Sequence, residues 1–240
     1  MLELSFDKRL VSLTAPSSFA AEQYQGLQLT LERISRARDT KVIAVTSPGT
    51  GDGKTLTTLN LAAALARSNA RVLVIDADLR RPSVMTRLGL GEARATGLAD
   101  LVYSKTLKLK DVIHAVPSTN LWVMPAGELT TPVHTVLSSP RLKELLAEAR
   151  AEFDYVVLDT PPLLPVFDAA LLASAVDGIL LIVAANKTPR KLLGEALNML
   201  EADKVLGIVF NRDERPLFGY YDRNYRQYFT DTPSTAARQA

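Results

Sequence analysis

Three short motifs combine residue types that bind phosphate with residue types that bind a divalent cation. They are Ser-Pro-Gly-Thr-Gly-Asp-Gly-Lys-Thr at 47–55, Asp-Ala-Asp-Leu-Arg at 76–80 and Asp-Thr-Pro-Pro at 159–162. In the first motif, glycines let successive backbone N–H groups face an anion. The Lys54 ammonium then neutralises phosphate oxygens, and the Thr55 hydroxyl coordinates Mg²⁺. Together the motifs predict a nucleoside triphosphate site.

The glycine-rich motif stands between a predicted strand and a predicted helix. The apolar run 41–46 precedes it, and an Ala/Leu-rich stretch at 56–68 follows it. This order places the positive end of the helix against the loop, as a phosphate-binding loop (P-loop) requires. The generic P-loop pattern begins with glycine, and Pro48 stands at that position in this chain. We expect the loop to bind phosphate in spite of this departure.

Two carboxylates directly follow apolar runs. Asp76 follows 72–75 and Asp159 follows 155–158. The C-terminal ends of parallel strands meet at one edge of a sheet, where ligands bind. Carboxylates gathered there repel one another unless a cation offsets them, which favours Mg²⁺. The alternative is that Asp76 or Asp78 caps a following turn.

Composition excludes several classes of protein. The chain has 240 residues, 47% of them hydrophobic, which suits one sizeable α/β domain. The net charge is +2 and the basic residues are dispersed, so no nucleic-acid partner is indicated. Without cysteine the chain has no thiol catalysis, no iron–sulfur ligation and no disulfide framework. His114 and His134 stand near no acidic cluster, so a histidine metal site is not expected.

The sequence gives no sign of a targeting segment. Charged residues occur at 1–8, where a signal peptide needs an apolar run. The apolar stretch 178–185 is strand-sized and too short to cross a bilayer. We therefore expect a cytoplasmic protein.

Alternating strands and helices predict an α/β P-loop NTPase fold, with a mostly parallel sheet flanked by helices on both faces. Long helices are expected at 17–38, 56–68, 141–152 and 189–202, and short ones begin at 81 and 96. Strands are expected at 41–46, 72–75, 121–125, 155–158, 179–184 and 205–210. The predicted division is an N-terminal arm and helix at 1–39, a P-loop domain at 40–212 and a flexible tail at 213–240.

The predicted tail is rich in tyrosine. It contains four of the seven tyrosines of the chain: Tyr220, Tyr221, Tyr225 and Tyr228. Disordered tails are usually poor in aromatic residues. The cluster is therefore unusual for a mobile tail, and packing of these tyrosines on the domain or on a partner surface remains open.

The motifs in this order resemble the bacterial tyrosine kinases (BY-kinases) of capsule and exopolysaccharide production. The similarity covers about residues 17–229 and includes the P-loop, Asp-x-Asp-x-Arg, Asp-x-x-Pro and the tyrosine cluster. It implies a non-specific protein-tyrosine kinase that uses ATP and Mg²⁺ and phosphorylates its own Tyr220, Tyr221, Tyr225 and Tyr228. The products are ADP and protein phosphotyrosine.

The resemblance also assigns roles to individual residues. Lys54, Asp76 and Asp78 would be catalytic, with Asp76 as the acceptor of the tyrosine proton. Thr55, Asp78 and Asp159 would hold the metal, while Arg80 and Pro162 complete their motifs. The ATP-binding residues would be Gly49, Thr50, Gly51, Asp52, Gly53, Lys54, Thr55, Leu56, Asn211 and Arg212, with Asn211 contacting adenine.

The family also suggests partners. Some members are fused to a transmembrane chain-length regulator, and others are separate subunits that need such a membrane partner. This chain resembles the separate type, recruited from the cytoplasm to the inner face of the membrane. Family members commonly assemble through Glu-x-x-Arg-x-x-Arg, whereas this chain has Glu22, Gln25 and Gln28. We expect self-association, but not a closed ring, because the charge-assisted contacts are lost.

Two other functions remain open. Partitioning and cell-division ATPases share the fold, but they carry a signature lysine where this chain has Gly49, and they lack the tyrosine cluster. A non-catalytic scaffold of the export complex, switched by ATP, would use the same loop. The motifs alone do not separate this scaffold from the kinase.

Overall fold

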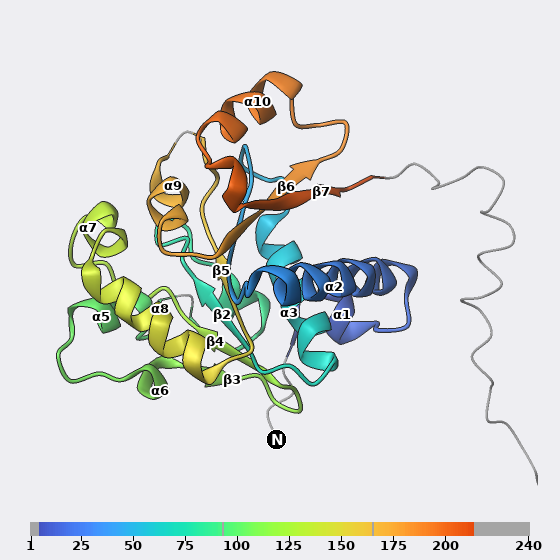
Figure 1. The fold of residues 1–240 in the computed structure, drawn as a ribbon. Helices are drawn as coiled ribbons and strands as arrows, with labels where there is room; N and C mark the ends of the chain where they lie inside the picture. The colour runs from blue at the N-terminus through green and yellow to red at the C-terminus, as the bar shows by residue number, and fades with distance from the viewer. Residues whose placement is uncertain (1–4, 93, 165, 214–240) are drawn as a thin grey trace, which may run out of the picture.

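A seven-stranded sheet forms the centre of the molecule (Figure 1). The computed structural model describes residues 5–92, 94–164 and 166–213. In spatial order the strands are β3 (His114–Ala115), β4 (Leu121–Met124), β2 (Val72–Asp76), β5 (Tyr155–Asp159), β1 (Val42–Thr46), β6 (Gly178–Ala184) and β7 (Val205–Asn211). Every neighbouring pair is parallel except β3 and β4. The predicted, mostly parallel sheet is confirmed.

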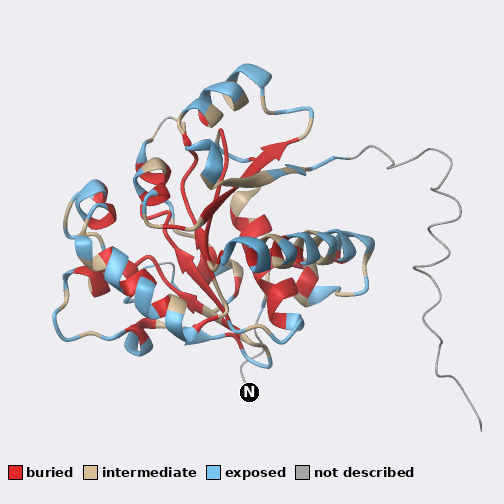
Figure 2. Ribbon diagram, in the orientation of Figure 1, coloured by how far each residue is buried: buried red, intermediate tan, exposed pale blue. Residues whose placement is uncertain are grey.

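Helices cover both faces of the sheet because the central strands are apolar on both sides. Along β2, Val72 and Val74 face one hydrophobic cluster, and Leu73 and Ile75 face the other. Figure 2 shows these strands buried inside a shell of partly exposed helices. The first face is covered by α2 (Phe19–Arg38), α3 (Lys54–Arg67) and α4 (Val84–Arg87). The second is covered by α5 (Leu98–Tyr103), α6 (Leu109–Val112), α7 (Val133–Leu137), α8 (Pro140–Glu152), α9 (Asp168–Ala173) and α10 (Arg190–Asn198).

The N-terminal segment is attached to the sheet through α3. The short helix α1 (Val11–Thr14) and α2 both pack against α3. Asn60 of α3 accepts a hydrogen bond from the Ser12 N–H at 3.0 Å and donates one to the Arg9 carbonyl at 3.0 Å. The Ser18 hydroxyl caps α2 by accepting from the Ala21 N–H, which is why this helix begins at Phe19. The division at residues 39 and 212 stays a prediction.

The helix expected at 189–202 ends earlier, and that expectation was wrong. Its last turn tightens, because the N–H groups of Met199 and Leu200 bond to carbonyls three residues back, at 3.2 and 3.1 Å. Leu200 turns inward, and a separate 3₁₀ helix η1 (Ala202–Lys204) leads into β7. The elements α1, α6, α7 and β3 were not predicted, because two to five residues are too few to show periodicity.

No helix within residues 5–92, 94–164 and 166–213 combines the length and the apolar character needed to cross a membrane.

Gly97 packs closely against the backbone of the loop that follows β4. A Cβ atom there would overlap the Pro125 carbonyl group and lie 2.8 Å from the Gly127 nitrogen. We expect Gly97→Ala to lower the free energy of unfolding by about 2 kcal/mol, since backbone has to move. Gly26→Ala is the matched control, because nothing lies within 4 Å of its Cβ position in α2. It should raise stability by up to about 1 kcal/mol. Urea unfolding measures both, and equal effects of the two changes would contradict the packing.

Candidate functional site

The P-loop between β1 and α3 is held in shape by its own polar contacts. Gly51 and Gly53 have positive φ angles of 80° and 99°, which disfavour other residues. The buried Asp52 carboxylate accepts hydrogen bonds from the Gly49 N–H at 3.1 Å and from the Thr188 hydroxyl at 2.8 Å. Asp52 was predicted to bind ATP, and in the structure its carboxylate supports the loop. The loop residues Thr50 and Gly51 are exposed, whereas Leu56 is half-buried.

Asn211 brings the end of β7 to the P-loop. Its amide nitrogen donates to the Asp52 carbonyl at 2.8 Å, and a Cβ atom on Gly53 would collide with it. The exposed Arg212 follows, with a positive φ angle of 60°. The structure therefore places both residues beside the loop, while their contact with adenine stays a prediction.

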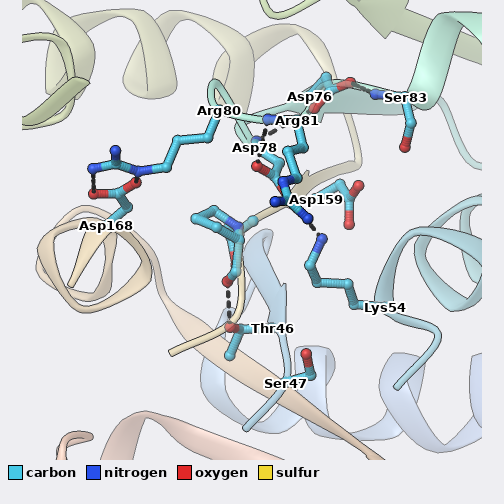
Figure 3. A network of polar contacts seen from close by, with 12 residues as sticks. Thr46, Ser47, Lys54, Asp76, Asp78, Arg80, Arg81, Ser83, Asp159 and Asp168 are labelled. Carbon is cyan, nitrogen blue, oxygen red and sulfur yellow. Dashed lines mark hydrogen bonds and ion pairs between the residues drawn. The ribbon is translucent and has the colours of Figure 1, made fainter. Parts of the chain in front are cut away.

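Lys54 and three carboxylates gather at the C-terminal edge of the sheet. Asp76 and Asp159 are register partners on β2 and β5. The Lys54 ammonium lies 2.9 Å from Asp78 Oδ2, and both side chains are largely buried (Figure 3). The structure thus brings Lys54, Asp76, Asp78 and Asp159 together, as the motifs predicted.

Asp76 and Asp78 also fix the turns that follow β2. Asp76 Oδ2 accepts from the N–H groups of Ser83 at 2.8 Å and Val84 at 3.0 Å (Figure 3). Asp78 Oδ1 accepts from the Arg81 N–H at 3.0 Å. The turn-capping alternative is therefore correct for both residues. It does not exclude a role at the site, because the turn that Asp78 Oδ1 caps also holds the Asp78 Oδ2 atom 2.9 Å from the Lys54 ammonium.

Burial and mutual repulsion change the acidity of the cluster. Burial, with the charge of Asp159 adding to it, raises the pKa of Asp76 to about 7. Burial also raises the pKa of Asp159, against the opposing effect of Lys54. For Lys54, burial lowers the pKa, but the charges of Asp159 and Asp78 outweigh it, and the pKa is raised. Lys54 is therefore a cation at neutral pH, and Asp76 changes its charge near neutral pH.

The site has the features that a Mg²⁺ ion requires. Asp159 is buried, and among the described residues its Oδ2 has no hydrogen-bond partner, while the Thr58 hydroxyl lies 3.4 Å from its Oδ1. The buried Thr55 begins the first turn of α3 beside it. Across the described residues, no three His, Cys, Asp or Glu side chains form a ready-made metal cage. Mg²⁺ uses one or two carboxylates together with waters and phosphate oxygens, and Asp159 is a carboxylate of this kind.

The segment 159–162 is anchored to the end of β1. The Thr46 hydroxyl donates to the Pro161 carbonyl at 2.9 Å, and the Leu163 N–H donates to the Ser47 carbonyl at 2.8 Å. Pro162 lies between Pro161 and Leu163 in the sequence, and it is buried. These bonds keep the Asp159 carboxylate at the base of the P-loop.

Sequence reasoning missed two residues that organise the site. Asp168, at the start of α9, is 4% exposed and forms a bidentate ion pair with Arg80, at 2.6 and 3.1 Å (Figure 3). Thr188, after β6, holds Asp52. Neither belongs to a spaced motif. The one available signal for Asp168 was a charge that interrupts an otherwise apolar stretch.

Two groups of predicted residues remain. Tyr220, Tyr221, Tyr225 and Tyr228 fall outside the described residues. Glu22 is exposed and Gln25 half-buried on α2, while the buried Gln28 donates to Glu32 within the same helix at 2.7 Å.

Comparison with known proteins identifies close relatives. A family model described as an AAA domain matches residues 40–202. The tyrosine-protein kinase YwqD of Bacillus subtilis is 33% identical over 219 residues, which are 89% of this chain and 91% of YwqD. The succinoglycan biosynthesis transport protein ExoP of Rhizobium meliloti is 32% identical over 95% of this chain, which spans 31% of ExoP. The kinase domain of the Escherichia coli tyrosine kinase ETK has a TM-score of 0.77 and 26% identity, covering 87% of this chain and 83% of that domain.

The raised pKa of Asp76 predicts a pH-dependent stability. Between about pH 4 and pH 7 the folded protein retains a proton that the unfolded chain has lost, so the free energy of unfolding falls as pH rises. The loss is on the order of 4 kcal/mol at most for a shift of about three units, and it ends above about pH 7. Asp76→Asn should flatten the decrease. Urea unfolding in the absence of Mg²⁺ at about pH 5 and pH 8 measures it, and identical pH profiles for the variant and the wild type would refute the assignment.

Proposed function

This chain belongs to the bacterial tyrosine-protein kinases, and from that premise we propose that it is an ATP-dependent autokinase of its own C-terminal tyrosines. We assign it to the regulation of capsule or exopolysaccharide synthesis or export. The observation that carries the proposal is the Lys54 ammonium held 2.9 Å from Asp78, beside the buried Asp76 and Asp159, at the base of a preformed P-loop.

The proposed reaction needs a proton acceptor and charge neutralisation. A tyrosine hydroxyl has a pKa near ~10 and is a weak nucleophile at neutral pH. Its oxygen bonds to the γ-phosphorus while the bond from that phosphorus to the ADP oxygen breaks, and we assign the released proton to Asp76. A carboxylate with a pKa of about 7 is well matched to that task. No covalent enzyme intermediate is required, since positioning and charge supply the catalysis.

The remaining site residues have supporting roles in this proposal. Lys54 neutralises the β- and γ-phosphate oxygens, and the P-loop N–H groups orient them. Thr55, Asp78 and Asp159 would hold Mg²⁺, which when bound offsets the charge of the phosphates. The unpartnered Oδ2 of Asp159 supports this assignment.

We propose that the tail is phosphorylated between subunits. Strand β7 ends at Asn211, beside the P-loop, so the tail leaves the domain close to the site. Tyr220 lies eight positions after Arg212 in the sequence, a span of at most roughly 30 Å. Each phosphate adds roughly −1.5 to −2 charge, so several on neighbouring tyrosines would repel one another and loosen an assembly held by the tail.

The membrane partner is part of the proposal. ExoP is named a transport protein, and this chain covers 31% of it but 91% of the kinase YwqD. We infer that this kinase acts in the cytoplasm and is recruited to the inner face of the membrane by a transmembrane chain-length regulator. Self-association through a closed ring is not expected, because Gln28 already bonds to Glu32 within its own helix.

Incubation with Mg·ATP tests the kinase. Intact-mass and peptide mass spectrometry should find phosphate on Tyr220, Tyr221, Tyr225 or Tyr228 in the wild type, with and without the cytoplasmic segment of a membrane partner. Lys54→Met should lose at least about 10²-fold in rate, since it removes the charge on the transferring phosphate. ATP binding and hydrolysis with unmodified tyrosines under every condition would instead establish a nucleotide-switched scaffold.

A mixing experiment separates transfer within a chain from transfer between chains. The acceptor is Lys54→Met with an intact tail, and the donor is a chain whose four tail tyrosines are changed to phenylalanine. Phosphate on the acceptor tail demonstrates transfer between chains. Transfer within one chain predicts an unmodified acceptor even though wild-type protein is phosphorylated.

A further inference from the structure

The loop between β6 and α10, residues 185–189, is fixed against the P-loop. The Thr188 hydroxyl donates to Asp52 Oδ1 at 2.8 Å and accepts from the Ala184 N–H at 3.1 Å. Leu192 of α10 approaches to 3.2 Å from the position of a Cβ atom on Gly49. The β6–α10 loop therefore keeps a set position over the phosphate-binding loop.

Lys187 projects from this loop onto the P-loop. Its ammonium lies 3.4 Å from the position that a Cβ atom would take on Gly51, whose φ angle is 80°. A tight turn places it there, because the Lys187 N–H bonds to the Ala184 carbonyl at 3.2 Å and Asn186 has a φ angle of 58°. The side chain is exposed, and within the part of the chain that the structure describes it forms no ion pair.

The charge balance of the site indicates what the Lys187 ammonium could bind. Three carboxylates stand behind the P-loop, and the Lys54 ammonium is already paired with Asp78. A polyphosphate that enters the loop is repelled by the carboxylates, and Lys54 alone does not offset them. Lys187 approaches from a different element, and its charge is available to an incoming anion.

We propose that Lys187 is a second phosphate-binding cation of the nucleotide site, contacting the polyphosphate of the bound nucleotide, and that the Thr188–Asp52 hydrogen bond positions it. The proposal rests on the nucleotide binding assumed in the proposed function. It assigns to Lys187 direct contact with the ligand, and to Thr188 and Asp52 the placing of the loop.

Nucleotide affinity, measured by calorimetry on the full chain with Mg·ATP and Mg·ADP, tests the assignment without relying on kinase activity. Lys187→Ala should weaken both affinities by about fivefold to tenfold, as expected for one charge-assisted contact. The difference from wild type should shrink at high NaCl, because salt screens an exposed charge. Lys187→Arg should retain most of the affinity. The matched control is Lys191→Ala, which removes an exposed lysine 4.0 Å from Glu195 and should change nothing.

A second pair of variants tests whether the Thr188–Asp52 hydrogen bond positions Lys187. Thr188→Val removes the hydroxyl that holds Asp52 but keeps Lys187. Like Lys187→Ala, it should weaken nucleotide affinity and reduce the salt dependence of that affinity. Thr188→Ser keeps a hydroxyl and should restore both. Wild-type affinity and salt dependence in Lys187→Ala would overturn the proposal while leaving nucleotide binding intact. If the wild type itself binds neither nucleotide, the proposed function fails together with this inference. The two failures are therefore distinguishable.

Discussion

The charge balance at the C-terminal edge of the sheet constrains everything around it. Parallel pairing of β2 with β5 makes Asp76 and Asp159 neighbours, and Asp78 follows two residues later. Burial, with the charges of neighbouring carboxylates adding to it, raises the pKa values of Asp76 and Asp159, and the Lys54 ammonium opposes this effect at Asp159. Within the part of the chain that the structure describes, Asp159 Oδ2 accepts no hydrogen bond. A cation that joins this cluster lowers the cost of its negative charges, and this links the fold to nucleotide chemistry.

The loops around the cluster are fixed by side chains that do not themselves need to touch a nucleotide. Asp52 joins the P-loop to the β6–α10 loop, and Asn211 joins it to the end of β7. Asp168 joins the Asp-x-Asp-x-Arg segment to α9 through Arg80. Each contact connects segments that follow different strands. The contacts therefore hold these segments in place relative to one another. Preorganisation of this kind lowers the cost of orienting phosphate groups during transfer.

The sequence predicted the parts of the site that follow from strand ends. Asp76 and Asp159 are the last residues of β2 and β5, and Lys54 is the first residue of α3, so their place at one edge of a parallel sheet could be derived from pattern alone. Asp168 and Thr188 could not be derived in this way, because their partners lie 88 and 136 residues away in the chain. Asp52 was predicted to bind ATP because its neighbours in the sequence are phosphate-binding residues. Only the three-dimensional structure shows that its carboxylate accepts hydrogen bonds from Gly49 and Thr188.

The Asn211 side chain connects the end of β7 to the P-loop. Asn211 donates to the Asp52 carbonyl, and the Arg212 N–H donates in turn to the Asn211 side-chain oxygen at 2.9 Å. The backbone that leads to the tail is therefore two hydrogen bonds away from the loop that cradles phosphate. One side chain makes both hydrogen bonds, so a displacement of the Asn211 amide acts on the P-loop backbone and on the Arg212 backbone together.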